Sequence, residues 1–357
     1  CVPGGRADGV AMAVPAAEEG ILVVNCREFL RTKTFFRHSL YANASYIWAS
    51  QVAWSVLSFV FWLVAARLYP KETVGLAGTV VSAMMLIGTL SFLGLGQALI
   101  RFLPESDRPQ DLVNTSFGLV TLACSLVATI FLAGIRWQSS ALSSVLADGV
   151  FRAMFISLSV GYILFEVLSS IFVALRVACN TLILTLIAGG LRIGLVFVMS
   201  LVSREAVSLF AVYGGPLLLA FLVGVIVLLP RCLAGYQLGW QGLSLHAILP
   251  MFRFSLGNYL NNLLWMAPGR LFPLVVINTL GEVAAADFYI AWLLANAMTT
   301  ASASLATSLF AEGSSASHRL SENTRRSLWS GLLVTGLCAA GLFVLARPVL
   351  MIFGEEY

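Results

Sequence analysis

The amino-acid sequence predicts an all-α, polytopic membrane protein built as a helical bundle. Hydrophobic residues make up 59% of the 357 residues, charged residues make up only 11%, and the mean hydropathy is +0.91. A soluble domain carries about 25% charged residues, so this chain lacks the polar surface that a water-soluble fold needs. Several uncharged windows of about 20 residues match the hydrocarbon thickness of a bilayer. These apolar runs do not alternate with polar residues, which excludes a transmembrane β-barrel.

The stretch Phe59–Pro104 shows the pattern most clearly. Two long apolar runs are joined by the polar segment Arg67–Glu72, and the second run closes on Gly94-Leu95-Gly96 before the basic residue Arg101. An apolar hairpin of this length needs a membrane around it, so we interpret it as two spans. The same criterion predicts nine spans, at residues 45–66, 74–100, 113–135, 151–175, 181–202, 207–229, 254–279, 284–310 and 327–346.

The positions of lysine and arginine predict the orientation of these spans. When successive spans alternate in direction, the flanks and loops on the side of the N-terminus carry about twice as many Lys and Arg residues as the opposite side. Cytoplasmic loops are enriched in these two residues. The N-terminus is therefore predicted to be cytoplasmic.

A short internal echo predicts a division into two bundles. Phe36–Leu40 (FRHSL) precedes the first predicted span, and Phe252–Leu256 (FRFSL) precedes the seventh. An even number of spans separates the two copies, so both have the same orientation, as in the parallel repeats of many transporters. The predicted organisation is an N-terminal extension, disordered or interfacial, at residues 1–36, a first six-helix bundle at 37–229, a cytoplasmic linker at 230–248 and a partial second bundle of about three spans at 249–357.

No catalytic signature accompanies the predicted spans. The sequence has no glycine-rich phosphate loop with a lysine, no HExxH and no GxSxG. Its six cysteines are scattered, without the spacing of metal ligands. We therefore predict that the protein is not an enzyme and that it holds neither a metal nor another cofactor.

Two charged residues lie deep in neighbouring predicted spans, Glu166 in the fourth and Arg192 in the fifth. A charge at mid-bilayer costs about 2.5–3.5 kcal/mol on insertion scales, so such residues usually face a bundle interior or an aqueous cavity. One interpretation is a structural ion pair between the two helices, which the GxxxG spacing of Gly190 and Gly194 favours by permitting close approach. The other is that Arg192 meets an anionic substrate while Glu166 balances its charge or titrates to couple transport.

Arg270 lies in the seventh predicted span, between Pro268-Gly269 and Pro273. Two prolines and a glycine remove backbone donors and predict a kink in the helix. Because broken helices at membrane depth usually line a cavity, a cation at this point predicts an anion-facing site or a gate. The alternative is an arginine that bends its long stem to reach the membrane interface.

A cluster of side-chain amides, Asn258, Asn261 and Asn262, lies early in the same span, beside Tyr259. Tandem amides can bind the hydroxyl groups of a sugar, and they can equally bond neighbouring helices. We include them with Arg192 and Arg270 as candidate substrate-binding residues.

Several segments of the chain resemble a known family of transporters. The segments that carry the resemblance are AARLYPKETVGLAG (65–78), LGLGQALIRFLP (93–104), FRFSLGNYL (252–260), ADFYIAWLLANAM (286–298), SLFAEGS (308–314) and FGEEY (353–357). They are similar to polysaccharide biosynthesis and export proteins, the Wzx-type oligosaccharide flippases of the multidrug/oligosaccharidyl-lipid/polysaccharide (MOP) superfamily. The resemblance implies a MATE/MOP-like fold of two pseudo-symmetric bundles around a central cavity. Since the family has a dozen or more spans, we expect this sequence to be a fragment with an incomplete second bundle.

The resemblance also implies a function and partners. Such flippases move an undecaprenyl-pyrophosphate-linked oligosaccharide across the bacterial cytoplasmic (inner) membrane by alternating access, and cationic cavity residues are the expected contacts for the pyrophosphate. The implied partners are this anionic lipid-linked oligosaccharide, membrane lipids and polysaccharide assembly proteins, with no nucleic acid among them. The alternatives are a cation-coupled multidrug exporter of the same superfamily and a membrane polymerase or ligase of the same sugars.

Overall fold

A computed structural model describes most of the predicted spans. It describes residues 39–138, 148–233, 235–239 and 245–296, together with Trp329, Leu333, Gly336, Ala340, Phe343, Met351 and Phe353. The predicted N-terminal extension, and most of the last two predicted spans, lie outside these residues. The described residues belong to one compact unit, Ser39–Tyr357.

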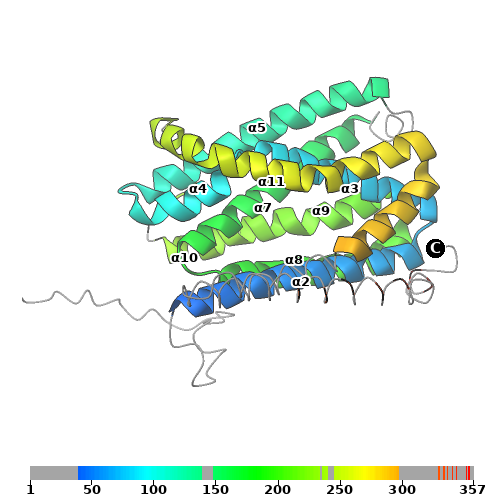
Figure 1. Cartoon of the computed structure of the whole chain (residues 1–357), viewed down its shortest axis with the longest axis horizontal. Coiled ribbons are helices and arrows are strands. Elements are labelled where there is room, and N and C mark those ends of the chain that lie inside the picture. The colour runs from blue at the N-terminus through cyan, green and yellow to red at the C-terminus, as the bar shows by residue number, and fades with distance from the viewer. Residues whose placement is uncertain are drawn as a thin grey trace, which may run out of the picture. The chain divides into compact units, whose positions relative to one another are not determined.

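The described residues form helices joined by short connections, and no strand occurs among them (Figure 1). The elements are α2 (Ser39–Leu68), α3 (Lys71–Ser91), α4 (Leu95–Phe102), the 3-10 turn η1 (Leu103–Glu105), α5 (Pro109–Gln138), α7 (Gly149–Ala174), α8 (Cys179–Val202), α9 (Ala206–Val223), the π-helical turn η2 (Gly224–Leu228), α10 (Leu229–Cys232), α11 (Leu245–Leu280) and a further helix over 282–296. Within these residues, 7 helices are long and apolar enough to cross a membrane, and they correspond to the first seven predicted spans. The predicted fold class is confirmed.

The second predicted span, 74–100, is wrong in its extent. α3 ends at Ser91, and the chain turns through Leu93 (φ 53°) and Gly94 (φ 71°) before α4 begins. Two successive residues in the left-handed region cannot continue a right-handed helix. A Cβ added at Gly94 would also lie 2.7 Å from the Cβ of Ser255 in α11. The glycine therefore ends α3 and lets α11 approach the turn.

The chain stays helical at the prolines of the seventh span, and the kink predicted there stays a prediction. α11 is helical without interruption past Pro268 and Pro273. Membrane helices tolerate proline because neighbouring groups can satisfy the freed carbonyls. The glycine between them serves packing, since a Cβ added at Gly269 would lie 2.5 Å from the indole of Trp292. α9 likewise continues past Pro216, although the π-helical turn follows it within the same span.

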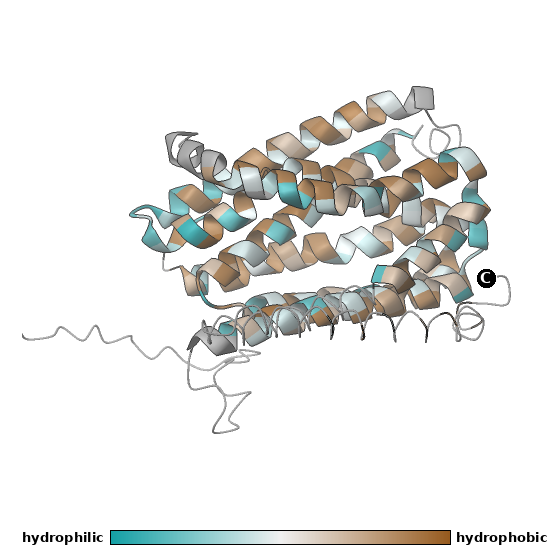
Figure 2. Ribbon diagram, viewed as in Figure 1, coloured by the Kyte–Doolittle hydropathy of each residue, from teal (hydrophilic) through white to brown (hydrophobic). Residues whose placement is uncertain are grey.

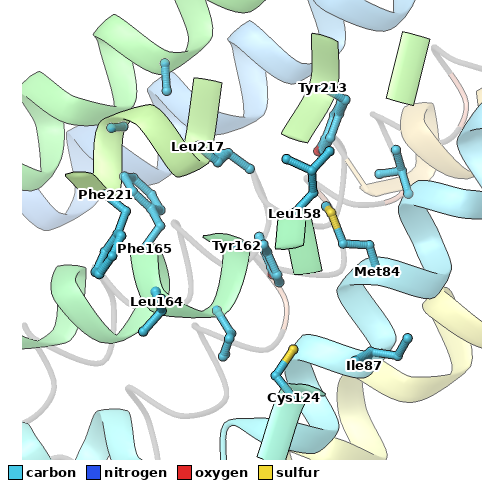
Figure 3. Packing of buried hydrophobic residues seen from close by; sticks show 14 of the residues in the cluster. Met84, Ile87, Cys124, Leu158, Tyr162, Leu164, Phe165, Tyr213, Leu217 and Phe221 are labelled. Atoms are coloured by element: carbon cyan, nitrogen blue, oxygen red, sulfur yellow. The ribbon is translucent and has the colours of Figure 1, made fainter. Parts of the chain in front are cut away.

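The helices of the first predicted bundle share one buried core. α8 packs against α2 and α9, α7 packs against α5 and α9, and α3 contacts α7 and α9 on one side and α11 on the other. Figure 3 shows part of this core, where Met84 of α3, Leu158 and Tyr162 of α7 and Tyr213 and Leu217 of α9 lie close together. The division of the chain into two bundles stays a prediction.

The outward faces of the long helices are apolar. On α5, Leu122, Leu126 and Ile130 repeat every four residues, and each is 62–64% exposed. Figure 2 shows hydrophobic residues along the lengths of the helices and hydrophilic residues gathered mainly near their ends. A row of exposed aliphatic side chains on one helix face is the surface expected against lipid tails, and the chain is therefore a multi-pass membrane protein.

Hydrogen bonds between the connections agree with the predicted alternation of the spans. At one end, the amide of Ala178 after α7 donates to Asn43 Oδ1 at the start of α2 (3.1 Å). At the opposite end, Thr73 at the start of α3 donates to the carbonyl of Arg204 between α8 and α9 (3.2 Å). Helices that are adjacent in sequence therefore run in opposite directions.

The connection between the sixth and seventh spans is fastened to α5. The Tyr236 hydroxyl donates to Asn114 Oδ1 (2.8 Å), and Asn114 Nδ2 donates to the carbonyl of Gln237 (3.0 Å). α11 begins at Leu245, inside the predicted linker 230–248. Helical residues therefore occur inside the predicted linker, and its residues Tyr236 and Gln237 are bonded to α5.

Candidate functional site

Two neighbouring cavities lie among the helices. The first, of about 270 Å³, lies between α2, α3, α7, α8 and α11, and we name it the polar cavity. The second, of about 360 Å³, lies between α2, α3, α9, α11 and the helix 282–296, and we name it the aromatic cavity. The polar cavity is lined by Gln51, Glu166, Thr181, Thr185, Asn262 and Arg270, among others. The aromatic cavity is lined by Trp54, Trp62, Tyr213, Trp265, Tyr289 and Trp292, among others.

The two cavities follow one another along α2. Ser50 and Gln51 line only the polar cavity, whereas the residues from Ser55 to Trp62 that face inward line only the aromatic cavity. Because α2 is long enough to cross a membrane, this order places the cavities at successive depths. The side chains that line both are Trp54, Met85, Met266 and Arg270.

Arg270 is therefore the cation at the junction of the cavities. Its Nη1 donates to the carbonyl of Met85 in α3 (2.5 Å), and its Nη2 lies 3.5 Å from the sulfur of Met266 one turn earlier in α11. The side chain is half-buried, and its charge acts on the Glu166 carboxyl and the Tyr162 hydroxyl of α7. A guanidinium has more N–H donors than these contacts use, and it stays charged in a protein. It can therefore offer donors to a ligand in either cavity.

Glu166 lines the polar cavity and is half-buried. The predicted ion pair with Arg192 is not formed: within the residues described, the ion pair found joins Lys71 and Asp287. The physical reason is the direction of Arg192, which faces α2 and α9 and not α7. The nearby cation for Glu166 is Arg270, from a helix far away in sequence.

Arg192 is only 1% exposed and lines neither cavity. Its guanidinium carbon lies 3.9 Å from the ring centroid of Tyr213, 5.1 Å from that of Trp54 and 5.8 Å from that of Phe61. Tyr213 and Trp54 line the aromatic cavity, so Arg192 lies behind its wall. Cation–π contact stabilises a desolvated arginine. Its Nε and Nη2 have no hydrogen-bond partner among the described residues.

The small residues beside Arg192 do not pack as predicted. A Cβ added at Gly190 or Gly194 would meet nothing within 4 Å. A Cβ added at Gly189 would instead collide with the side chain of Leu57 in α2. The close approach of α8 to α2 therefore depends on Gly189, one residue outside the GxxxG spacing.

The predicted asparagine cluster is divided by the structure. Asn262 lines the polar cavity, Asn261 is exposed and lines neither cavity, and the side chain of Asn258 lies outside the described residues. Tyr259, between them, donates to the carbonyl of Leu90 at 2.8 Å and holds α11 against α3. One amide of the cluster is thus placed to contact a ligand.

Sequence reasoning missed the uncharged side chains of both cavities. Thr181 lines the polar cavity and Ser58 the aromatic cavity, and each hydroxyl is buried with no hydrogen-bond partner among the described residues. A buried polar atom without a partner is rare in native proteins. A single serine or threonine in an apolar span does not stand out in the sequence. Whether its hydroxyl is buried without a partner depends on how the neighbouring helices cover it.

The lining of both cavities offers groups that can bind a ligand. The described residues contain no group of three or more His, Cys, Asp or Glu side chains placed to hold a metal. The histidines of the sequence, at positions 38, 246 and 318, fall outside the described side chains. What the cavities offer is one permanent cation, one carboxyl, several hydroxyl and amide groups, and a set of aromatic rings.

The sequence matches no family model and no curated protein. The structure is similar to a MATE family multidrug resistance transporter of the MOP superfamily in an inward-facing conformation, with a TM-score of 0.56 and 15% identity over 86% of this chain and 75% of that one. For the outward-facing conformation of a MATE family transporter, the TM-score is 0.56 and the identity is 16% over 89% of this chain and 74% of that one. A MOP superfamily transporter from Pyrococcus furiosus, described as having a binding pocket of reverse polarity, also has a TM-score of 0.56 and 16% identity. The likeness covers 89% of this chain and 74% of that one. At such low identity these likenesses show the fold, and they confirm the predicted MATE/MOP-like architecture.

Proposed function

We propose that this protein is a transporter that moves a lipid-linked oligosaccharide, with its anionic pyrophosphate head, across the cytoplasmic membrane by alternating access. Two observations support transport. The fold is shared with transporters whose structures are known in inward-facing and outward-facing conformations. The cavities lie at successive depths among helices that are long and apolar enough to span a membrane.

The observation that carries the choice of substrate is the position of Arg270 between the cavities. Its guanidinium is held by a backbone carbonyl and a thioether, and it has donors left for a ligand. Arginine presents a planar fork that matches the oxygen atoms of a phosphate. The charge of Arg270 acts on the nearby Glu166 carboxyl, and an anionic ligand would compete with this carboxyl. An anion bound at Arg270 would be in reach of both cavities.

The proposal includes an orientation. The connections that carry more Lys and Arg belong to the end of α2 that begins at Ser39, so we place this end in the cytoplasm. The polar cavity then lies toward the cytoplasmic side, where such lipid-linked sugars are assembled. Membrane lipids and polysaccharide assembly proteins are the partners that we propose.

The alternative function is a cation-coupled multidrug exporter. Two features favour it: the Glu166 carboxyl lines a cavity, and aromatic faces such as that of Trp54 attract organic cations. Solved structures with the same fold include multidrug resistance transporters. This alternative makes Glu166, and not Arg270, the essential charge.

The test is transport by the purified protein in liposomes. The probe is a fluorescent short-chain polyprenyl-pyrophosphoryl disaccharide, whose movement between leaflets is followed by quenching from outside. We expect Arg270→Ala to lower the initial rate at least about tenfold, equivalent to about 1.4 kcal/mol. Arg270→Lys should restore only part of the rate, because an ammonium cannot bind a phosphate in the bidentate manner of arginine.

The matched control is Arg108→Ala, which removes an exposed arginine from the connection before α5. It should transport at the wild-type rate. A normal rate in Arg270→Ala would overturn the proposal. Export of an organic cation that is lost in Glu166→Gln and kept in Arg270→Ala would establish the alternative.

A further inference from the structure

The aromatic cavity has a composition that the anion-binding role of Arg270 does not explain. Aromatic rings dominate its lining, and Arg270 is its one charged side chain among the residues described. We propose that this cavity is a subsite for uncharged sugar rings, which stack on its aromatic side chains while the pyrophosphate lies at Arg270. This inference rests on the proposed function. It assigns a binding site to the sugar part of the ligand, for which the proposed function gives none.

The aromatic rings are held in place by glycines opposite them. A Cβ added at Gly78 in α3 would lie 3.0 Å from the ring of Tyr289, and one added at Gly269 in α11 would lie 2.5 Å from the indole of Trp292. Each ring therefore lies directly against a helix backbone. Such contact restricts the rings before any ligand arrives, which lowers the entropy that binding must cost.

Two separate sets of ring contacts support side chains of the lining. The centroid of Trp62 lies 4.6 Å from that of Tyr289 and 5.8 Å from that of Tyr213. In the second set, Trp292 stacks on Phe288, which lies outside the lining, with ring centroids 5.9 Å apart and an interplanar angle of 19°. Trp265, also in the lining, is 82% exposed and has a free face. Flat apolar faces of this kind suit the C–H face of a pyranose ring.

Hydroxyl and amide groups accompany the rings and distinguish a sugar from a hydrocarbon. Ser55, Ser58, Ser82 and Asn296 all line the cavity. Ser58 is 8% exposed as a whole residue. Its hydroxyl oxygen is buried and has no hydrogen-bond partner within the described part of the chain. Rotation of the Ser58 side chain would turn this hydroxyl toward a sugar hydroxyl, whereas an isoprenoid chain would offer it no partner. The lining therefore favours the sugar over the lipid tail.

The test compares ligands with and without a sugar, using the full chain in lipid nanodiscs. The probes are farnesyl pyrophosphate and farnesyl-pyrophosphoryl glucose, galactose and N-acetylglucosamine, and binding is followed by quenching of tryptophan fluorescence. In the wild type we expect at least one sugar-bearing probe to bind about tenfold tighter than farnesyl pyrophosphate. Trp292→Leu and Ser58→Ala should each remove most of this gain and leave binding of farnesyl pyrophosphate unchanged. Trp292→Phe, which keeps a ring, should restore part of the gain.

The matched control is Trp48→Leu, which changes an exposed indole of α2 outside both cavities and should leave every affinity unchanged. Equal weakening of all probes in Trp292→Leu would mean that the lipid tail occupies the cavity, and would overturn the inference. A wild type that gains nothing from any of the three sugars would also overturn it, while Arg270-dependent binding of farnesyl pyrophosphate would leave the proposed function standing. Binding of neither kind of probe would overturn the proposed function itself.

Discussion

At the scale of single residues, the two arginines in the spans have different surroundings. Arg270 borders two cavities and contacts a carbonyl and a thioether, whereas Arg192 lies behind the wall of one cavity among three aromatic rings. From the sequence alone, both are cations inside predicted spans, and both are candidates to contact an anionic substrate. The structure separates them, because only one has accessible surface in a cavity. A direct contact of Arg192 with substrate stays a prediction.

We expect Arg192→Ala to destabilise the fold by more than about 2 kcal/mol, because it leaves a void among packed aromatic rings. Arg192→Met should fold nearly as well as the wild type, since it fills the space and removes buried N–H groups that have no partner. Thermal unfolding of the purified variants in detergent measures this difference. If Arg192→Met folds normally and yet loses transport, Arg192 acts on the substrate, as one interpretation of the sequence holds.

At the scale of elements, the turn between α3 and α4 sets how closely α11 can approach. Gly94 combines a φ of 71° with a distance of 2.7 Å from its hypothetical Cβ to that of Ser255. We expect Gly94→Ala to cost about 1–3 kcal/mol through backbone strain and the collision. Gly134→Ala in α5 is the matched control, because a Cβ there meets nothing within 4 Å. It should be neutral or stabilising by up to about 1 kcal/mol.

These two glycine variants are compared by their unfolding temperatures under the same conditions. A loss in Gly94→Ala no larger than that in Gly134→Ala would show that the turn is adaptable. In that case the contact between α4 and α11 would not depend on the glycine.

The segment 235–239 adds a pH-dependent contact between elements. Burial raises the pKa of Tyr236 above its ordinary value of 10.0, because the charged phenolate is disfavoured away from water. Its contribution to stability is therefore complete below pH 10 and is lost as pH rises through the folded-state pKa, since the unfolded chain ionises first. We expect the wild type to lose more thermal stability than Tyr236→Phe as the pH rises from about 9 to about 11. Parallel curves for the two proteins would show that the phenol is not protected in the fold.

At the scale of the whole unit, α3 meets the helix 282–296 in a tight seam beyond the aromatic cavity. Lys71 Nζ lies 2.7 Å from Asp287 Oδ1, and a Cβ added at Gly75 would collide with the backbone carbonyl of Glu282. The carboxylate partner is 52% exposed, so this ion pair contributes no more than about 1 kcal/mol. The close packing of the two helix backbones at Gly75 therefore contributes more than the ion pair to holding α3 against the helix 282–296.

If transport proceeds by alternating access, this seam must open in each cycle. We expect a short bifunctional methanethiosulfonate, which forms a disulfide with each thiol and releases sulfinate, to join the Lys71→Cys and Asp287→Cys positions in a background without native cysteines. The link should abolish transport in liposomes. Reduction should restore it. The single variants treated in the same way serve as controls. Undiminished transport by the joined protein would show that the seam stays closed throughout the cycle.

How much of this molecule can be foreseen from its sequence depends on the range of the interactions involved. The spans follow from local hydropathy, because an apolar run must leave water whatever its neighbours are. Each of the first seven predicted spans corresponds to a described helix, although the second ends earlier than predicted. The deep charges Glu166 and Arg270 were also evident, since any ionised group in a span is costly and stands out. The resemblance of short motifs pointed to the superfamily whose fold the structure shares.

Other features required the three-dimensional arrangement, because they depend on residues far apart in the chain. The cation whose charge acts on Glu166 is Arg270, which is far away in sequence, and not the neighbouring Arg192, since the packing of several helices sets the direction of a side chain. The helix continues past Pro268, and the packing of Gly269 against Trp292 becomes evident only in the structure. Hydropathy reports which residues leave water. Which of them meet in a cavity is determined only when the helices pack.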